Sequence, residues 1–82
     1  MDVPYYDNPS GNLSVQVELR HTSNVFLVDQ PNFNSYKRGQ QYNYYGGSFD
    51  HSPAVINVSG SRRWYLIVDN GSGEQYRYKW IK

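Results

Sequence analysis

The sequence predicts an all-β domain, either a small antiparallel β-sandwich or a partly open barrel of about six to eight short strands. Two observations carry this prediction. Several short segments alternate apolar with polar residues or form short apolar runs, and turn-forming residues separate them. Helical periodicity, in contrast, extends over no more than about six residues anywhere in the chain. With 82 residues, the chain is expected to form a single domain over residues 1–82.

The first strands are predicted from the N-terminal part of the chain. Residues 1–6 are expected to form a short edge strand, which the turn residues 8–11 end. Residues 13–19 alternate between apolar and polar side chains, so we expect a strand with one buried and one exposed face. The apolar run 25–28 is unbroken, which predicts a central strand covered on both faces. Pro31 is expected to close this strand because it lacks a backbone donor.

One short helical turn is predicted next, from Phe33 to Arg38. Asn32 is a suitable N-cap because its side-chain oxygen can accept from a backbone N–H one turn on. Gly39 is a suitable residue after the helix, since glycine tolerates a positive φ. Phe33 and Tyr36 are three residues apart and share a face, which we expect to pack on the sheet while the following basic pair faces water.

The segment 42–45 is predicted to form a strand after this helical turn. Gly46 and Gly47 are expected to end it in a turn, because paired glycines permit positive φ. The other interpretation of paired glycines is that they let a ligand approach the main-chain amides.

The C-terminal part is predicted to contain three more strands. Residues 54–58 and 63–69 are rich in β-formers, and their even-numbered positions are expected to face the core. Residues 70–73 are a strong hairpin signal, because Asn-Gly suits the positive φ values of a tight turn. The last strand, residues 76–80, is expected to place three aromatic side chains on one face and two cations on the other.

The composition limits the size of the core. Hydrophobic residues make up 38% of the chain, nine residues are tyrosine and the mean hydropathy is −0.81, so a single chain has a marginal core. The chain has no cysteine and two histidines, so neither a disulfide nor a structural metal site is expected to add stability. We therefore predict a homo-oligomer, which buries more surface.

Charge and hydropathy exclude two classes of partner. The net charge is +1, whereas proteins that bind long nucleic acids usually carry a clear basic excess. The sequence has no secretory signal and no apolar run long enough to cross a bilayer. We therefore expect no long nucleic-acid partner, no membrane and a soluble protein in the cytoplasm.

The stretch 29–53 gathers residues that are suited to bind a ligand. It contains six aromatic residues, a basic pair and one of the two histidines. Tyrosine rings can stack on flat bases, and Arg and Lys make charge-assisted hydrogen bonds to phosphates. The structural alternative is that the tyrosines are strand formers and the cations form a solvated edge that prevents aggregation. The candidate ligand-binding residues are Asn32, Tyr36, Lys37, Arg38, Tyr44, Tyr45, His51 and Arg63.

The sequence does not predict a catalytic site. Asp50, His51 and Ser52 are adjacent, whereas the members of a catalytic triad converge from separate elements. His21 and His51 with scattered aspartates do not form the pattern of a metal site. We therefore predict a protein that is not an enzyme and that has no catalytic residue, metal or cofactor.

Four motifs follow one another along the chain: NVFLVDQPNFNSYKRG, YYGG, SP and WYLIVD. In this order and at this spacing they resemble the bacterial domain-of-unknown-function family 1883, over about residues 13–81. The resemblance implies a compact β-sandwich and assigns no activity. Some members are fused to TIR domains, which make or respond to nucleotide-derived signals in bacterial immunity. We expect this chain, which shows no TIR segment, to be a free-standing copy, for example one encoded by a phage.

From the residues and the resemblance together, we expect a non-enzymatic module that binds or sequesters a nucleotide-derived signalling molecule. The expected ligand is a cyclic oligonucleotide or an ADP-ribose derivative, and the expected role is a phage anti-defence sponge or a sensor in bacterial immunity, in the bacterial cytoplasm. Two alternatives stay open: a protein–protein interaction or assembly module of a TIR-type immune system, and a glycan-binding module. Replacing Arg38 or Arg63 with Glu is expected to abolish nucleotide binding and hardly affect sugar binding.

Overall fold

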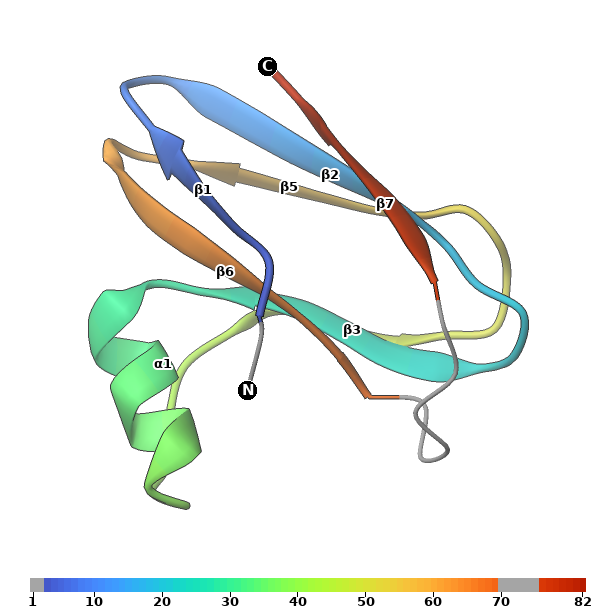
Figure 1. Ribbon diagram of the computed structural model, residues 1–82, viewed down its shortest axis with the longest axis horizontal. Helices are drawn as coiled ribbons and strands as arrows, with labels where there is room; N and C mark the ends of the chain where they lie inside the picture. Colours follow the sequence, from blue (N-terminus) through green and yellow to red (C-terminus); the bar gives the residue numbers. More distant parts are fainter. Residues whose placement is uncertain (1–2, 70–75) are drawn as a thin grey trace.

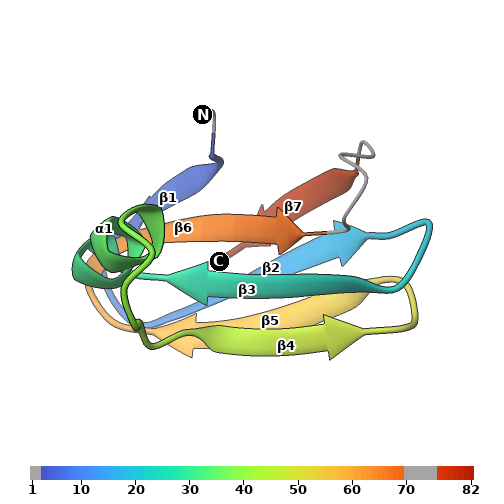
Figure 2. The same cartoon turned by 90° about the horizontal axis from the view of Figure 1, so that it is seen from below.

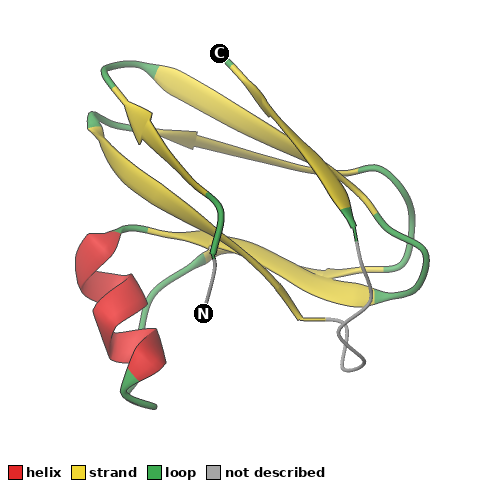
Figure 3. Cartoon of the chain, in the orientation of Figure 1, coloured by secondary structure: helices red, strands yellow, loops and turns green. Residues whose placement is uncertain are grey.

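The computed structural model describes residues 3–69 and 76–82, which form a two-layer β-sandwich with one short helix (Figures 1 and 3). The elements in chain order are β1 (Tyr5–Asn8), β2 (Asn12–Glu18), β3 (Ser23–Val28), α1 (Gln30–Lys37), β4 (Tyr45–Phe49), β5 (Ala54–Ser59), β6 (Arg62–Asp69) and β7 (Arg77–Ile81). The predicted all-β fold is confirmed, with two separate sheets rather than a closed barrel. No helix in the described residues is long and apolar enough to cross a membrane.

Both sheets are antiparallel and combine strands from distant parts of the chain. The four-stranded sheet has the order β1-β6-β3-β4, and the three-stranded sheet has the order β5-β2-β7. The predicted central position of residues 25–28 is confirmed, since β3 lies between β6 and β4. The predicted N-terminal edge strand is also present, but it starts at Tyr5 and includes Asn8.

The main core lies between the two sheets. Its buried members are Leu13, Val15, Val17, Val25, Leu27, Ala54, Ile56, Val58, Trp64 and Leu66. The alternation predicted for residues 13–19 and 54–58 is therefore confirmed, because the apolar side chains of β2 and β5 face this core. In β7, Tyr78 and Trp80 lie opposite the buried Val17 and Val15, whereas Arg77 and Lys79 lie opposite the outward-facing Glu18 and Gln16. The predicted separation of aromatic and cationic faces is therefore confirmed, and Trp80 packs against the main core while Tyr78 stays exposed.

Helix α1 lies against the outer face of the four-stranded sheet (Figure 1). A second apolar cluster fills the interface between them. Phe33 from the helix stacks on Tyr65 of β6, and their ring centroids are 4.0 Å apart. The other buried members are Phe26, Val28 and Ile67. This cluster explains the unbroken apolar run in β3, because alternate side chains of that strand enter different clusters.

The helix begins earlier than predicted. Its N-cap is Asp29, whose Oδ1 accepts a hydrogen bond from the backbone N–H of Asn32 at 3.2 Å. Asn32 is therefore inside the first turn, and Pro31 occupies a position there that tolerates its fixed φ and its missing N–H. Pro31 opens the helix instead of closing β3, which already ends at Val28. Gly39 follows the C-cap with a φ of +72°, as predicted.

The prediction for the segment around the paired glycines is wrong. Residues 42–44 lie outside any strand, and β4 starts at Tyr45 and runs through Gly46 and Gly47. Gly46 pairs with Phe26 of β3 and has a φ of +139°. A Cβ atom at this position would collide with the β3 backbone, so the glycine allows a close approach of two strands rather than a turn.

The predicted hairpin at residues 70–73 lies outside the described residues. The strands on either side of it, β6 and β7, pair within different sheets. They are therefore neighbours in sequence without forming a hydrogen-bonded pair with each other.

Candidate ligand-binding groove

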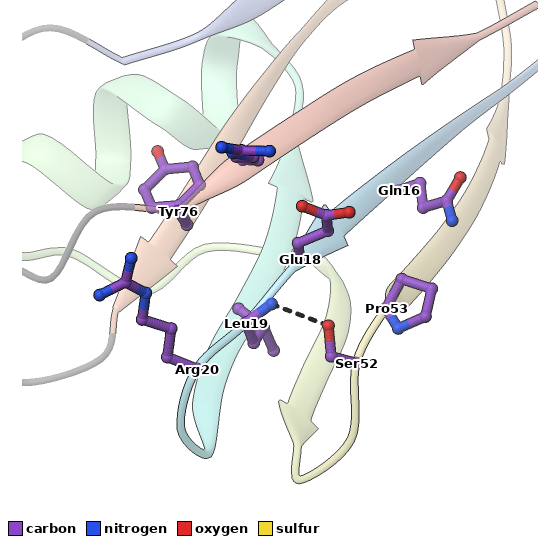
Figure 4. Close-up of a pocket in the computed structure, with 8 residues that line it drawn as sticks. Gln16, Glu18, Leu19, Arg20, Ser52, Pro53 and Tyr76 are labelled. Carbon is purple, nitrogen blue, oxygen red and sulfur yellow. Dashed lines mark hydrogen bonds between the residues drawn. The ribbon is translucent and has the colours of Figure 1, made fainter.

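An open groove of ≈ 660 Å³ lies on the outer face of the three-stranded sheet, where β2 ends and β5 and β7 begin (Figure 4). Small-molecule sites commonly have volumes of about 300–1,000 Å³. The groove is formed by three segments that are far apart in the sequence. Its lining residues are Gln16, Glu18, Leu19, Arg20, Ser52, Pro53, Tyr76 and Arg77.

Strand pairing fixes the positions of these residues. Alternate side chains of β2 enter the main core, so Glu18 points to the opposite, outer face. The register of β2 and β7 places Arg77 opposite Glu18. The hydroxyl of Ser52 accepts a hydrogen bond from the backbone N–H of Leu19 at 3.0 Å, which ties the β4–β5 connection to the end of β2 (Figure 4).

The groove carries more positive than negative charge. Arg20 and Arg77 each contribute a guanidinium group, and Glu18 contributes the carboxylate among its lining residues. Neither arginine forms an ion pair with any residue that the structure describes. An anionic ligand can therefore bind either guanidinium group without breaking an ion pair to a described residue, and arginine offers such a ligand a planar fork of donors.

Two smaller hollows continue the groove on either side. One, of ≈ 360 Å³, extends along β7 and adds Tyr78 and Lys79. The other, of ≈ 380 Å³, shares Leu19, Arg20 and Ser52 with the groove. It adds His21, Thr22, Asp50 and His51. A ligand longer than the groove can thus extend toward a further cation in one direction and toward two imidazole rings in the other.

Tyr76 lies on the same flank of the groove as Arg20, whereas Gln16 and Pro53 lie on the other flank (Figure 4). Its ring is half-buried because it packs against the main core. Burial and the neighbouring Tyr78 raise the pKa of the Tyr76 phenol above its ordinary value of 10.0. The phenol is therefore protonated at neutral pH and can donate a hydrogen bond.

Tyr36 and Tyr44, two of the predicted binding residues, lie on the other face of the sandwich, beside the cluster under the helix. The Tyr36 ring meets the Tyr42 ring edge-on at 5.3 Å between centroids. Tyr44 is tilted against Phe26, also with centroids 5.3 Å apart. Burial, together with Tyr36 and Tyr44, raises the pKa of the Tyr42 phenol. These rings form the partly exposed rim of the second apolar cluster.

Three more predicted residues lie on the same helix. Lys37 is exposed and its Nζ lies 4.7 Å from the centroid of the Phe33 ring, and Arg38 is the exposed C-cap. Asn32 has a structural role at the start of the helix. Its Nδ2 donates to Asp29 Oδ1 at 2.7 Å, and its Oδ1 accepts from the backbone N–H of Asn43 at 2.9 Å.

Tyr45 and His51 do not belong to this helix surface. Tyr45 belongs to β4 and meets the buried Trp64 edge-on, with ring centroids 5.6 Å apart. His51 lies in the β4–β5 connection, where its Nδ1 is 3.3 Å from Asp50 Oδ1. His51 is thus the predicted residue that lies next to the groove, through the hollow that it lines.

Arg63, the last predicted residue, already has a protein partner. Its Nε and Nη2 donate to the two carboxylate oxygens of Asp7 at 2.6 and 3.2 Å. The guanidinium also lies over the ring of Tyr5, 4.4 Å from its centroid. The pair lowers the pKa of Asp7 and raises the pKa of Arg63, chiefly through these hydrogen bonds. Arg63 joins β6 to the edge strand β1, away from the groove.

Asp50, His51 and Ser52 are exposed. His51 contacts Asp50, whereas the Ser52 hydroxyl accepts from the backbone of Leu19. Among residues 3–69 and 76–82, no group of three or more His, Cys, Asp or Glu side chains could hold a metal ion.

A family model described as a domain of unknown function, DUF1883, matches residues 8–78. The chain belongs to the DUF1883 family. A search of curated proteins and a search of solved structures found no match. The DUF1883 match includes every residue that lines the groove, from Gln16 to Arg77.

The groove of this DUF1883 protein was not predicted from its sequence. Its residues come from one strand end, one loop and one strand start, and the register of β2 with β5 and β7 brings them together. The outward position of Glu18 could be inferred from the alternation of residues 13–19. The proximity of Arg20 to Tyr76 and Arg77 could not, because it depends on strand order.

Proposed function

We propose that this DUF1883 protein is a non-enzymatic binding module for a nucleotide-derived signalling molecule, either a cyclic oligonucleotide or an ADP-ribose derivative. The observation that carries the proposal is the convergence of Arg20, Arg77 and the ring of Tyr76 on one groove of ≈ 660 Å³. Nucleotides combine phosphate groups with a flat base, and this groove offers a partner for each part.

In the proposed complex, the two guanidinium groups bind phosphate oxygens by charge-assisted hydrogen bonds. The exposed part of the Tyr76 ring contacts a base, and stacking of this kind contributes about 1–3 kcal/mol per base. The Glu18 carboxylate accepts from ribose hydroxyls, as acidic side chains do in dinucleotide sites. Gln16 offers an amide that can donate to and accept from a base edge.

The groove is separate from most of the binding residues predicted from the sequence, although His51 lies in an adjoining hollow. The groove lies on the outer face of the three-stranded sheet, whereas Tyr36, Lys37 and Arg38 lie around the helix on the other face of the sandwich. The proposal keeps the predicted ligand class and assigns it to the groove. Sequestration of the ligand by a phage protein and sensing of it in bacterial immunity are both roles for such a module.

The test is a ligand screen by thermal shift, followed by titration calorimetry. The ligands are cyclic dinucleotides, cyclic trinucleotides, ADP-ribose derivatives and simple sugars. A ligand present at about a hundred times its Kd stabilises the fold by about 2.7 kcal/mol, which raises the Tm of a domain of this size by several degrees. We expect one nucleotide class to do so and sugars to leave the Tm unchanged.

Charge reversal then locates the site. Arg20→Glu with Arg77→Glu is expected to abolish binding, while the matched control Arg38→Glu retains it, since all three arginines are exposed. Loss of binding in Arg38→Glu alone would move the site to the helix surface. If no nucleotide shifts the Tm, the proposed function fails. If sugars bind and the arginine variants still bind them, the protein is a glycan-binding module instead.

A further inference from the structure

The four edge strands of the sandwich lie on two sides, and these sides differ in charge. The strands β4 and β5 lie side by side along one side, and β1 and β7 lie along the other (Figure 2). The segments YGGSF of β4 and AVINVS of β5 contain no charged residue. On the other side, β1 contains Asp7, and β7 contains Arg77 and Lys79.

This difference matters because an edge strand presents unpaired backbone N–H and C=O groups. Soluble proteins usually protect such edges with charged side chains, above all lysine, which prevent pairing with another chain. The side formed by β1 and β7 has this protection, and the side formed by β4 and β5 does not. On the unprotected side, Val55 is 47% exposed and Tyr45 is 55% exposed.

We propose that a second copy of this chain pairs with the outer edge of β5. The two copies of β5 run antiparallel around a two-fold axis at Ile56, so that two three-stranded sheets join into one continuous sheet. This register places Ile56 opposite its own copy, Ala54 opposite Val58 and Val55 opposite Asn57. Each pair keeps core-facing residues opposite core-facing residues and outward residues opposite outward residues, as a continuous sheet requires.

Two of the other edge strands, β7 and β4, are less suited to pair with themselves. In β7, two-fold axes at Arg77, Tyr78 or Lys79 place cations directly opposite each other, which is destabilising. The strand β4 contains two glycines, which weaken strand pairing, and one of them is Gly46 with a φ of +139°. The strand β5 contains neither charged residues nor glycine, and its β-branched side chains favour strand pairing.

The single chain has a small core, so pairing with a second copy would stabilise it by burying more apolar surface. The predicted homo-oligomer follows from the low apolar content of the chain, and pairing of β5 with its copy places the exposed Val55 in contact with a partner strand. The inference does not depend on the proposed ligand, because Val55 does not line the groove.

The first test compares two matched substitutions by sedimentation equilibrium. Val55→Lys introduces a charge on the outward face of β5, and Ile81→Lys introduces the same charge on the outward face of the opposite edge strand. The two side chains are similarly exposed, at 47% and 40%. We expect a wild-type dimer that Val55→Lys weakens roughly tenfold or more, and that Ile81→Lys leaves unchanged. Thermal melts establish that both variants are folded.

The second test uses the absence of native cysteine. In the double variant Val55→Cys with Asn57→Cys, the proposed register places each new cysteine opposite the other kind in the second copy. Oxidised glutathione is then expected to produce a disulfide-linked dimer on a non-reducing gel, and either single variant is expected to produce far less. A monomeric wild-type protein at every concentration, an unaffected dimer in Val55→Lys, or a failure of the double variant to cross-link would each overturn the proposal.

Discussion

A Cβ atom on Gly46 would lie 2.2 Å from the carbonyl oxygen of Val25 and 2.8 Å from the Cα of Phe26. The two strands thus approach each other more closely than any side chain permits. Backbone atoms rather than flexible side-chain ends form this contact, so the fold can relieve a clash only by moving β3 or β4.

Gly46→Ala is therefore expected to destabilise the protein by at least about 1–3 kcal/mol, which is the usual cost of a strained backbone conformation alone. The matched control is Gly47→Ala in the same strand, where an added Cβ meets no atom within 4 Å. We expect the control to change the free energy of unfolding by no more than about 0.5 kcal/mol. Urea unfolding of both variants checks this prediction. If both variants lose the same free energy of unfolding, the close approach to Val25 is not the cause of the destabilisation.

The helix start provides the second prediction. Asp29 accepts from the backbone N–H and from the side chain of Asn32, and its Oδ2 accepts from Arg62 Nη1 at 3.0 Å. Asp29→Ala removes the N-cap and the ion pair together, so we expect a loss of about 1–2 kcal/mol, mostly from the cap. Asn32→Ala removes the side-chain hydrogen bonds to Asp29 and Asn43 but keeps the capped backbone N–H, so it is expected to cost less.

Chemical denaturation of the two single variants ranks these effects. If Asn32→Ala destabilises the protein more than Asp29→Ala does, the assignment of the N-cap is wrong.

The bidentate pair of Asp7 and Arg63 provides a prediction about pH. The pKa of Asp7 is lowered in the folded protein, chiefly by its hydrogen bonds from Arg63. The stabilisation is therefore present above the unfolded pKa of about 3.9 and is lost as the pH falls through the lower folded pKa. Asp7→Asn is expected to lower the Tm at pH 7 and to have little effect at about pH 2.

A double-mutant cycle identifies the partner. In an Arg63→Gln background, Asp7→Asn is expected to cause no further loss of Tm at pH 7, since the interaction is already absent. A full additional loss in that background would mean that Asp7 is stabilised by a different group.

Much of the fold can be predicted from local patterns of apolar and polar residues in the sequence. The alternation in β2 and β5 predicts which side chains enter the core, and the unbroken run in β3 predicts its central position. The start of the helix is harder to predict, because Asp29 and Asn32 are both good N-caps and Pro31 is compatible with a strand end as well as with a first helical turn. The role of Gly46 depends on its distance from Val25, which no local pattern reveals.

The candidate site is less predictable than the fold for a related reason. A stretch rich in tyrosine and basic residues predicts a binding site in the sequence. In the structure, however, Tyr36 mainly packs against other rings beside the helix. Arg63, which looks available in the sequence, is held by a carboxylate from the other end of the chain. The groove instead joins Arg20 with Tyr76, and only the pairing of β2 with β7 makes them neighbours.

The pairing of β2 with β7 also has a consequence for how the protein folds. The three-stranded sheet joins Ser14 to Ile81, and the four-stranded sheet joins Tyr5 to Tyr65, so each sheet needs strands from both ends of the chain. A nascent chain on the ribosome cannot complete either sheet until most of its residues have emerged. Topologies dominated by such distant contacts fold slowly, on the scale of about milliseconds to seconds, and leave strand edges open to other chains in the meantime.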